Sequence, residues 1–110
     1  MYYENVLPIK RHEAKIAFSS KNAINICDAL LRITYHDSDW QWVQSYCLYF
    51  SKHTDIEVRR LAITCIGHLA RIHGLLDLQL VNSLLNELIN DPEVHGYVQN
   101  ALDDISIYVQ

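Results

Sequence analysis

Six histidines and three cysteines are the residues of this 110-residue chain that could bind a metal ion or act as nucleophiles. His68 and His73 are five residues apart, whereas two histidines that bind one zinc ion from a single helix are usually four apart. The other histidines are scattered, and no Cys-x-x-Cys pair or glycine-rich phosphate loop is present. We therefore expect no metal site, no cofactor, no catalytic residues and no enzymatic activity.

The cysteines instead fit the interior of a helical protein. Cys47 and Cys65 fall on apolar stripes, and Cys27 lies beside one, so we expect all three to act as small buried apolar residues. An odd number of cysteines predicts a reducing compartment. The first residues lack the features of a signal peptide, and the longest mostly apolar run, 61–70, is half the length of a membrane span. These observations predict a cytoplasmic protein that does not associate with membranes.

Two features favour protein binding rather than catalysis. Asp103 and Asp104 are adjacent carboxylates near the end of a predicted helix, where negative charge opposes the helix dipole. We interpret them as an acidic contact for a basic partner, and a chance pair on a solvated surface is the alternative. Trp40 and Trp42 are two residues apart and cannot share a helix face, so Trp42 is expected in the core. Trp40 is then an exposed interface anchor or a cover for the junction between helix pairs.

An internal repeat of 36 residues predicts the elements that position these side chains. Residues 55–58 (Asp-Ile-Glu-Val) match residues 91–94 (Asp-Pro-Glu-Val), and the apolar residues that follow keep the same offset. They recur at i, i+3, i+4 and i+7, which is typical of an amphipathic helix. A third copy begins near Ser19. One position of the repeat carries a small residue each time, as expected where helices approach closely; these residues are Ala29, Cys65 and Ala101.

A second series of apolar stripes alternates with the first. It covers residues 42–50 and 80–88, with a weaker member over residues 8–18 that includes Ile16. Three glycines and two prolines are too few for the turns of most β folds. The chain is therefore predicted to be one all-α domain of about six helices, stacked as three helix-turn-helix units. The approximate units are 1–36, 37–73 and 74–110.

The helix ends carry recognisable capping residues. Asp91 before Pro92 predicts an N-cap followed by proline at the first helical position. Thr54 and Asp55 compete as the N-cap of the preceding long helix. Gly74 suits the residue that follows the end of that helix.

Charge is distributed unevenly along the chain. Residues 1–60 have a net charge of +1 and residues 61–110 a net charge of −5, which together give −4. Binding to nucleic acid is disfavoured because it requires a basic surface. The one basic cluster, Lys10, Arg11 and Lys15, is interpreted as a solvated helix end. The acidic half suits a basic protein partner.

The sequence Asp-x-Glu-Val-Arg-Arg-x-Ala over residues 55–62, set in a repeat of 36, resembles the HEAT-repeat family. The resemblance covers residues 19–110 and implies a short α-solenoid whose inner helices bind proteins. His95 stands where the family usually has arginine, and Ser19 and Ala23 make the first unit degenerate.

The segments 58–70 and 84–94 also resemble a small helical immunity protein of a bacterial contact-dependent growth inhibition (CDI) system. This resemblance implies an antitoxin that binds a cognate toxin domain, often a nuclease, and blocks it as a monomer in a one-to-one complex. The alternative function is a small HEAT-like adaptor or scaffold for a host cytosolic partner. A third hypothesis, an enzyme subunit or lyase of HEAT type, predicts turnover or a bound cofactor.

The 36-residue register nominates the partner-binding face. It places Arg32, His68 and Asp104 in one exposed row and Asp28, Thr64 and Asn100 in the next, and an ordinary solvated helix surface is the alternative. Tyr2, Tyr3 and Tyr49 are weaker candidates. The predicted partner-binding residues are Asp28, Arg32, Trp40, His68, Arg71, Glu87, Glu93, Gln99, Asn100, Asp103 and Asp104.

Overall fold

Six helices follow one another in the computed structural model, which describes residues 5–110. The helices are α1 (Arg11–Phe18), α2 (Ala23–His36), α3 (Trp40–Phe50), α4 (Ile56–His73), α5 (Leu78–Leu88) and α6 (His95–Tyr108). The prediction of an all-α fold is confirmed, and residues 5–110 contain no strand. Two of the weaker interface candidates, Tyr2 and Tyr3, lie outside the described residues.

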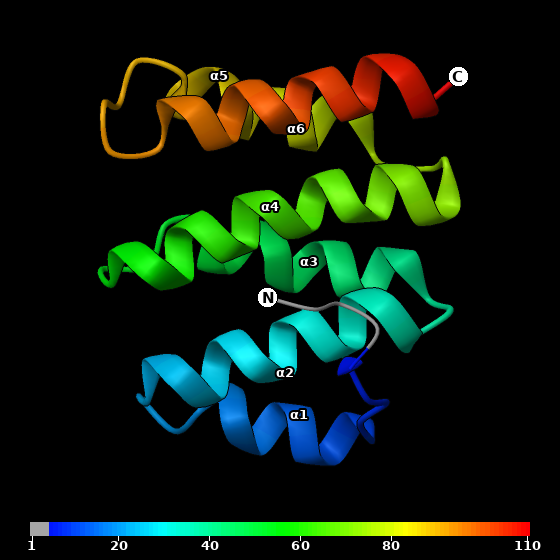
Figure 1. Cartoon of the computed structure of the whole chain (residues 1–110), viewed down its shortest axis with the longest axis vertical. Coiled ribbons are helices and arrows are strands. Elements are labelled where there is room, and N and C mark those ends of the chain that lie inside the picture. Colours follow the sequence, from blue (N-terminus) through cyan, green and yellow to red (C-terminus); the bar gives the residue numbers. More distant parts are fainter. Residues whose placement is uncertain (1–4) are drawn as a thin grey trace.

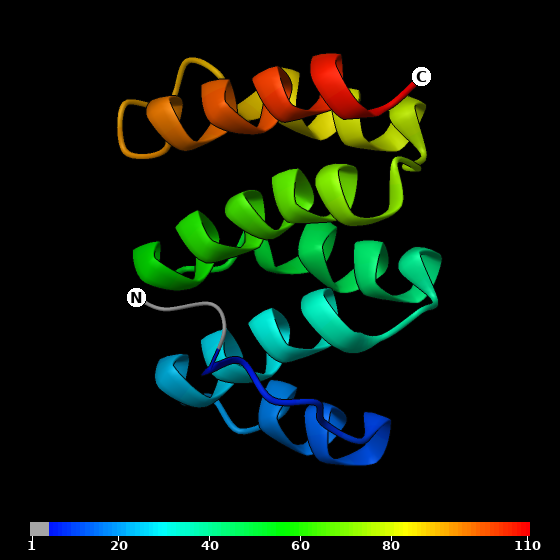
Figure 2. The same cartoon turned by 45° about the vertical axis from the view of Figure 1, so that its right-hand side comes forward.

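The helices form a stack with α4 at its centre. In Figure 1, α6, α4 and α2 lie one below another, with α5 behind α6 and α3 behind α4. The turned view in Figure 2 shows the same order from α6 at the top to α1 at the bottom. The most extensive helix contacts are those of α4 with α6, α2 and α3. This arrangement is the predicted HEAT-like stack, and its extents are 31 × 29 × 25 Å.

The repeated apolar positions form the core between the stacked helices. The three small residues of the repeat, Ala29, Cys65 and Ala101, are at most 2% exposed, which lets neighbouring helices approach closely. The other repeated apolar positions within one turn of them are also buried in α2 and α4; they are Ile26, Leu30, Ile33, Ala62, Ile66 and Leu69. In the first stripe the prediction for Ile16 is wrong, because Ile16 is 68% exposed and Ala14 is the buried residue of α1, whereas Ile9 and Ala17 pack against the core.

The structure decides between the two caps of α4 and moves the start of α6. Asp55 is the N-cap of α4, since its carboxylate accepts hydrogen bonds from the backbone amides of Glu57 and Val58. The predicted start of α6 at Pro92 is wrong, because α6 begins at His95. Residues 91–94 form a turn instead, in which the Glu93 amide donates to the Asp91 carboxylate at 3.0 Å.

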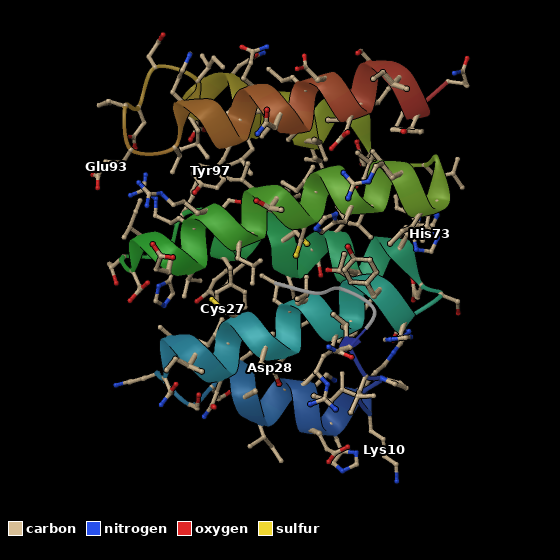
Figure 3. The ribbon with its side chains drawn as sticks, viewed as in Figure 1. Lys10, Cys27, Asp28, His73, Glu93 and Tyr97 are labelled. Atoms are coloured by element: carbon tan, nitrogen blue, oxygen red, sulfur yellow. The ribbon has the colours of Figure 1, made fainter. Side chains whose placement is uncertain are left out.

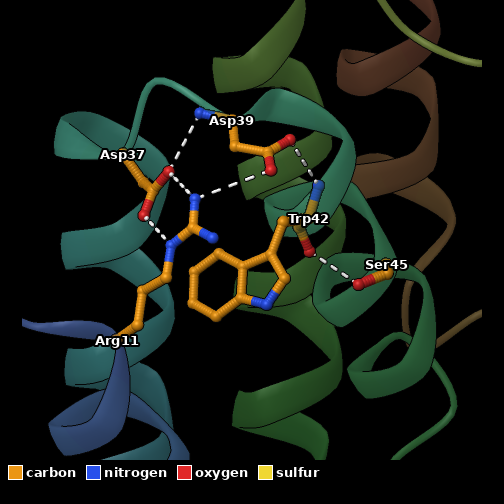
Figure 4. A network of polar contacts seen from close by, with 5 residues as sticks. All are labelled: Arg11, Asp37, Asp39, Trp42 and Ser45. Atoms are coloured by element: carbon orange, nitrogen blue, oxygen red, sulfur yellow. Dashed lines mark hydrogen bonds and ion pairs between the residues drawn. The ribbon is translucent and has the colours of Figure 1, made fainter.

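A polar cluster fastens α1 to the turn between α2 and α3 (Figure 4). The guanidinium of Arg11 donates two hydrogen bonds to the Asp37 carboxylate, at 2.8 and 2.9 Å, and lies 4.4 Å from the centre of the Trp42 ring. Asp39 lies 3.6 Å from the same guanidinium. The hydrogen bonds from Arg11 hold the pKa of Asp37 below its usual value. Arg11 is thus exposed at the start of α1, as its interpretation as a solvated helix end requires, but it also pairs with the turn between α2 and α3.

Gly74 and Gly96 lie in different backbone conformations, so the same substitution at each should affect stability in opposite directions. Gly74 ends α4 with φ of +63°, and a Cβ at that position would lie 3.3 Å from the Tyr108 carbonyl oxygen. Gly96 lies in α6, with no heavy atom within 4 Å of an added Cβ. We expect Gly74→Ala to lower the free energy of unfolding by about 1 kcal/mol and Gly96→Ala to raise it by up to about 1 kcal/mol. Thermal denaturation of both variants measures this, and equal effects of the two would contradict it.

Candidate partner-binding face

One stripe of α4 forms the middle of the candidate face. Glu57, Leu61, Thr64, His68 and Arg71 are spaced three or four residues apart and so lie on one side of the helix. Two surface hollows border this stripe, one against α2 and one against α6. We call the exposed side of the three stacked helices, with its two hollows, the α2/α4/α6 face.

The hollow between α4 and α6 is polar and has a volume of about 570 Å³. It brings together four of the predicted partner-binding residues, Arg71, Asn100, Asp103 and Asp104. The remaining lining residues are Thr64, Gly67, Tyr97 and Ala101. Figure 3 shows Tyr97 between α4 and α6, where Arg60 lies 5.3 Å from the centre of its ring. Thr64 and Asn100, which the register of 36 residues placed in one row, both line this hollow.

Asp104 has a structural role that its sequence context did not reveal. Its carboxylate accepts a hydrogen bond from Arg71 at 2.9 Å, which joins α6 to α4. A Cβ at Gly67 would lie 2.6 Å from the same carboxylate, so glycine at this position makes room for the ion pair. Asp103 is exposed and takes part in none of the ion pairs found within residues 5–110. Of the two adjacent carboxylates, Asp103 is the one available to a partner.

His68 is buried, and the prediction that it belongs to an exposed row is wrong. It is 3% exposed and packs against Tyr35 of α2, with its Nδ1 3.5 Å from the Tyr35 hydroxyl and hydrogen-bonded to the Arg71 guanidinium. Burial, and then the positive charge of Arg71, lower the pKa of His68 to about 4. His68 is therefore neutral at pH 7, and its Nδ1 can accept the hydrogen bond from the Arg71 guanidinium.

Arg32 also has an internal role. It donates hydrogen bonds to the carbonyl oxygens of Leu7 and Pro8, at 3.0 and 2.8 Å, and to Asp28 at 3.2 Å. These bonds fasten the segment that precedes α1 onto α2. Asp28 remains exposed on the neighbouring hollow between α2 and α4.

Four of the predicted residues lie away from the two hollows. Glu87 is on α5 and pairs with Lys52 of the α3–α4 turn at 2.9 Å. Glu93 is exposed in the turn before α6, at the left-hand side of the molecule in Figure 3. Gln99 is exposed on α6 but lines neither hollow. Trp40 is half-buried against the core, as Trp42 is, which agrees with its interpretation as a cover between helices rather than as an exposed anchor.

Much of the negative charge of the C-terminal half is neutralised within the chain. Arg59 pairs with Asp91, and Arg71 pairs with Asp104, so arginines of α4 meet carboxylates of the following helix pair. Arg60 donates to the Glu93 carbonyl oxygen at 3.1 Å. The carboxylates that give the C-terminal half its negative charge thus include some that join successive helix pairs through ion pairs.

The three thiols lie in the core or beside it. Cys47 and Cys65 are fully buried, and contact with Cys65 together with burial raises the pKa of the Cys47 thiol well above its usual value. Cys27 is half-buried, and burial, followed by the negative charge of Asp55, raises its pKa to about 11. Within residues 5–110, no three His, Cys, Asp or Glu side chains are placed to hold a metal ion, and no helix is long and apolar enough to cross a membrane.

A comparison with solved structures identifies the family of this chain. A chain in the crystal structure of a CDI complex from Cupriavidus taiwanensis LMG 19424 superposes with a TM-score of 0.88 and 32% sequence identity. The match covers 100% of this chain and 99% of that one. The two chains belong to one family. The sequence matches no protein-family profile and no curated protein. The predicted resemblance of this CDI-family protein to a CDI immunity protein is confirmed.

The sequence prediction missed the second hollow of this CDI-family protein, which lies between α2 and α4. Ile24 is 80% exposed at its edge, although its residue type favours burial. Ile24 lies outside the repeated apolar stripe of α2, so the helical pattern alone places this isoleucine on the surface. That signal could have indicated an apolar patch there. Tyr35, which contacts His68, was also missed.

The lowered pKa of His68 predicts a loss of stability in mild acid. Between pH 6.5 and pH 4 the unfolded chain binds a proton at His68 that the folded chain does not, so stability falls as the pH falls. From pH 7 to pH 5 this costs about 2 kcal/mol. In denaturant titrations at both pH values, His68→Gln should lose about that much less than the wild type. The exposed-site control His12→Gln should behave as the wild type, and equal losses in all three proteins would refute the assignment.

Proposed function

We propose that this protein is an immunity protein that binds a cognate toxin domain and neutralises it by stoichiometric occlusion in a one-to-one complex. The observation that carries the proposal is the full-length match, at a TM-score of 0.88, to a chain in the crystal structure of a CDI complex. The match extends over 100% of this chain and 99% of that chain, so the similarity is not confined to a single helix pair.

The α2/α4/α6 face is proposed as the surface that contacts the toxin. It combines a polar hollow with an apolar one, and protein interfaces generally combine an apolar centre with polar groups that set orientation. Asn100 and Asp103 supply exposed polar groups on α6, while Arg71 and Asp104 are held in place by their mutual ion pair. A pre-ordered pair loses little side-chain entropy on binding, which favours affinity.

The proposed toxin is a basic domain, and a nuclease in particular. A nuclease needs positive charge to bind a polyanionic substrate, and this chain has a net charge of −4. Opposite net charges accelerate encounter at low ionic strength. Occlusion of the substrate-binding surface or of an adjacent surface would both block such an enzyme.

Co-expression tests the function directly. The toxin domain encoded beside this gene should arrest growth when expressed alone, and growth should recover when this chain is produced with it. The two should co-purify in a ratio of one to one. An unrelated toxin domain of the same class serves as the control and should still kill. Killing in the presence of both chains, with no complex, would remove the proposal and favour the adaptor function.

Charge reversal tests the proposed face. Asp103→Lys changes an exposed carboxylate at the polar hollow, and Glu87→Lys makes the same change on α5, outside both hollows. We expect Asp103→Lys to slow association with the toxin domain by about fivefold to tenfold at low ionic strength, and less at high salt. Glu87→Lys should alter the rate by less than twofold. Stopped-flow or surface-binding kinetics measures both, and the reverse order of effects would place the interface elsewhere.

A further inference from the structure

The hollow between α2 and α4 differs in kind from the polar one beside it. Its volume is about 630 Å³, and its lining is mostly apolar. The apolar residues that line it are Ala23, Ile24, Cys27, Leu31 and Leu61. Figure 3 shows Cys27 in the space between the two helices. We call this hollow the α2/α4 groove.

Ile24 makes the α2/α4 groove unusual for a surface that faces only water. At 80% exposure it is the most exposed large apolar side chain in residues 5–110. It lies at the edge of the groove, whose floor includes the buried Leu31 and the half-buried Leu61. A contiguous apolar surface of this kind, rimmed by polar groups, is typical of a site that binds another molecule.

Three carboxylates form the rim of the groove. They belong to Asp28 on α2, to Glu57 on α4 and to Asp55, the N-cap of α4. The side chains of Asp28 and Glu57 are 62% and 73% exposed. Asp55 and Glu57 also contribute, after burial, to the raised pKa of Cys27, which indicates negative potential at the groove floor.

The arginines paired with this rim leave its carboxylates accessible. Arg32 contacts Asp28 at 3.2 Å but is also held by the Leu7 and Pro8 carbonyl oxygens. Arg60 contacts Glu57 at 3.4 Å but also binds the carbonyl oxygen of the turn before α6. Exposed pairs of this kind within one helix contribute only tenths of a kcal/mol, so a cation from a partner can share the carboxylates.

We propose that the α2/α4 groove receives an apolar side chain from a basic segment of the toxin domain. The apolar side chain covers Ile24 and Leu61, and lysine or arginine residues beside it meet Asp28 and Glu57. This proposal rests on the proposed function and adds the anchor point and its chemistry. The polar hollow on the other side of α4 then sets the orientation of the bound toxin.

Substitution of Ile24 tests the anchor. Ile24→Ser removes apolar contact area without adding charge, and its exposure means that folding should not change. Ile16→Ser makes the same change at the exposed isoleucine of α1, outside the groove. With the toxin domain encoded beside this gene, Ile24→Ser should weaken the complex about tenfold, mainly by faster dissociation, whereas Ile16→Ser should stay within twofold of the wild type.

A second variant tests the rim. Asp28→Asn combined with Glu57→Gln should slow association severalfold at low ionic strength and little at high salt, because the rim charges act on encounter. Glu13→Gln on α1 is the control and should have no effect. Thermal denaturation of every variant confirms that each remains folded at the assay temperature.

The possible outcomes distinguish a failure of the α2/α4 groove proposal from a failure of the proposed immunity function. If the wild type binds the toxin domain and Ile24→Ser binds equally well, the groove proposal is overturned and the immunity function stands. If the wild type forms no complex, the proposed function fails and the groove proposal fails with it. If sedimentation shows a dimer of the free wild type that Ile24→Ser abolishes, the occupant is a second copy of this chain, which also overturns the proposal.

Discussion

The close packing of α4 against both neighbouring inner helices is the constraint on which the rest of the structure depends. Ala29, Cys65 and Ala101 occupy equivalent positions of the repeat on α2, α4 and α6, and all three are almost completely buried. Larger side chains there would push the inner helices apart. This separation sets the width of both hollows on the α2/α4/α6 face. It also brings Arg71 within hydrogen-bonding distance of Asp104. Core packing and the binding surface are thus consequences of the same helix spacing.

Ion pairs between successive helix pairs add a second level of cohesion. Arginines of α4 form ion pairs with Asp91 and Asp104 of the next helix pair. Arg11 of α1 forms ion pairs with Asp37 and Asp39 in the turn between α2 and α3. Each exposed pair is weak by itself, but together they orient helix pairs that contact only their neighbours. The charge asymmetry of the sequence has this internal purpose in addition to any role in attracting a partner. The carboxylate of Asp103 is among those left for the solvent.

The α2/α4/α6 face has a polar part and an apolar part, and in the proposed interface these would supply a defined orientation and affinity, respectively. The apolar α2/α4 groove offers surface area to be removed from water, which is the main source of binding free energy. The polar hollow offers fixed groups whose geometry selects one orientation of the partner. Since a single stripe of α4 borders both hollows, one partner surface can engage them together.

The sequence by itself determined the all-α fold, the number of helices and the apolar faces of α2 and α4, because the period of 36 residues and the helical spacing within it are local properties of the chain. It also identified Gly74 as the end of α4, since the left-handed backbone at that point favours glycine. Tertiary structure alone decided that His68 is buried, that Asp104 is paired with Arg71, and that Ile24 lines a groove. The reason is physical: the helical period fixes the direction of a side chain around its own helix. Its exposure and its ion pairs depend on residues about 33 positions away, such as Asp104 for Arg71, that only the packing of helices brings near.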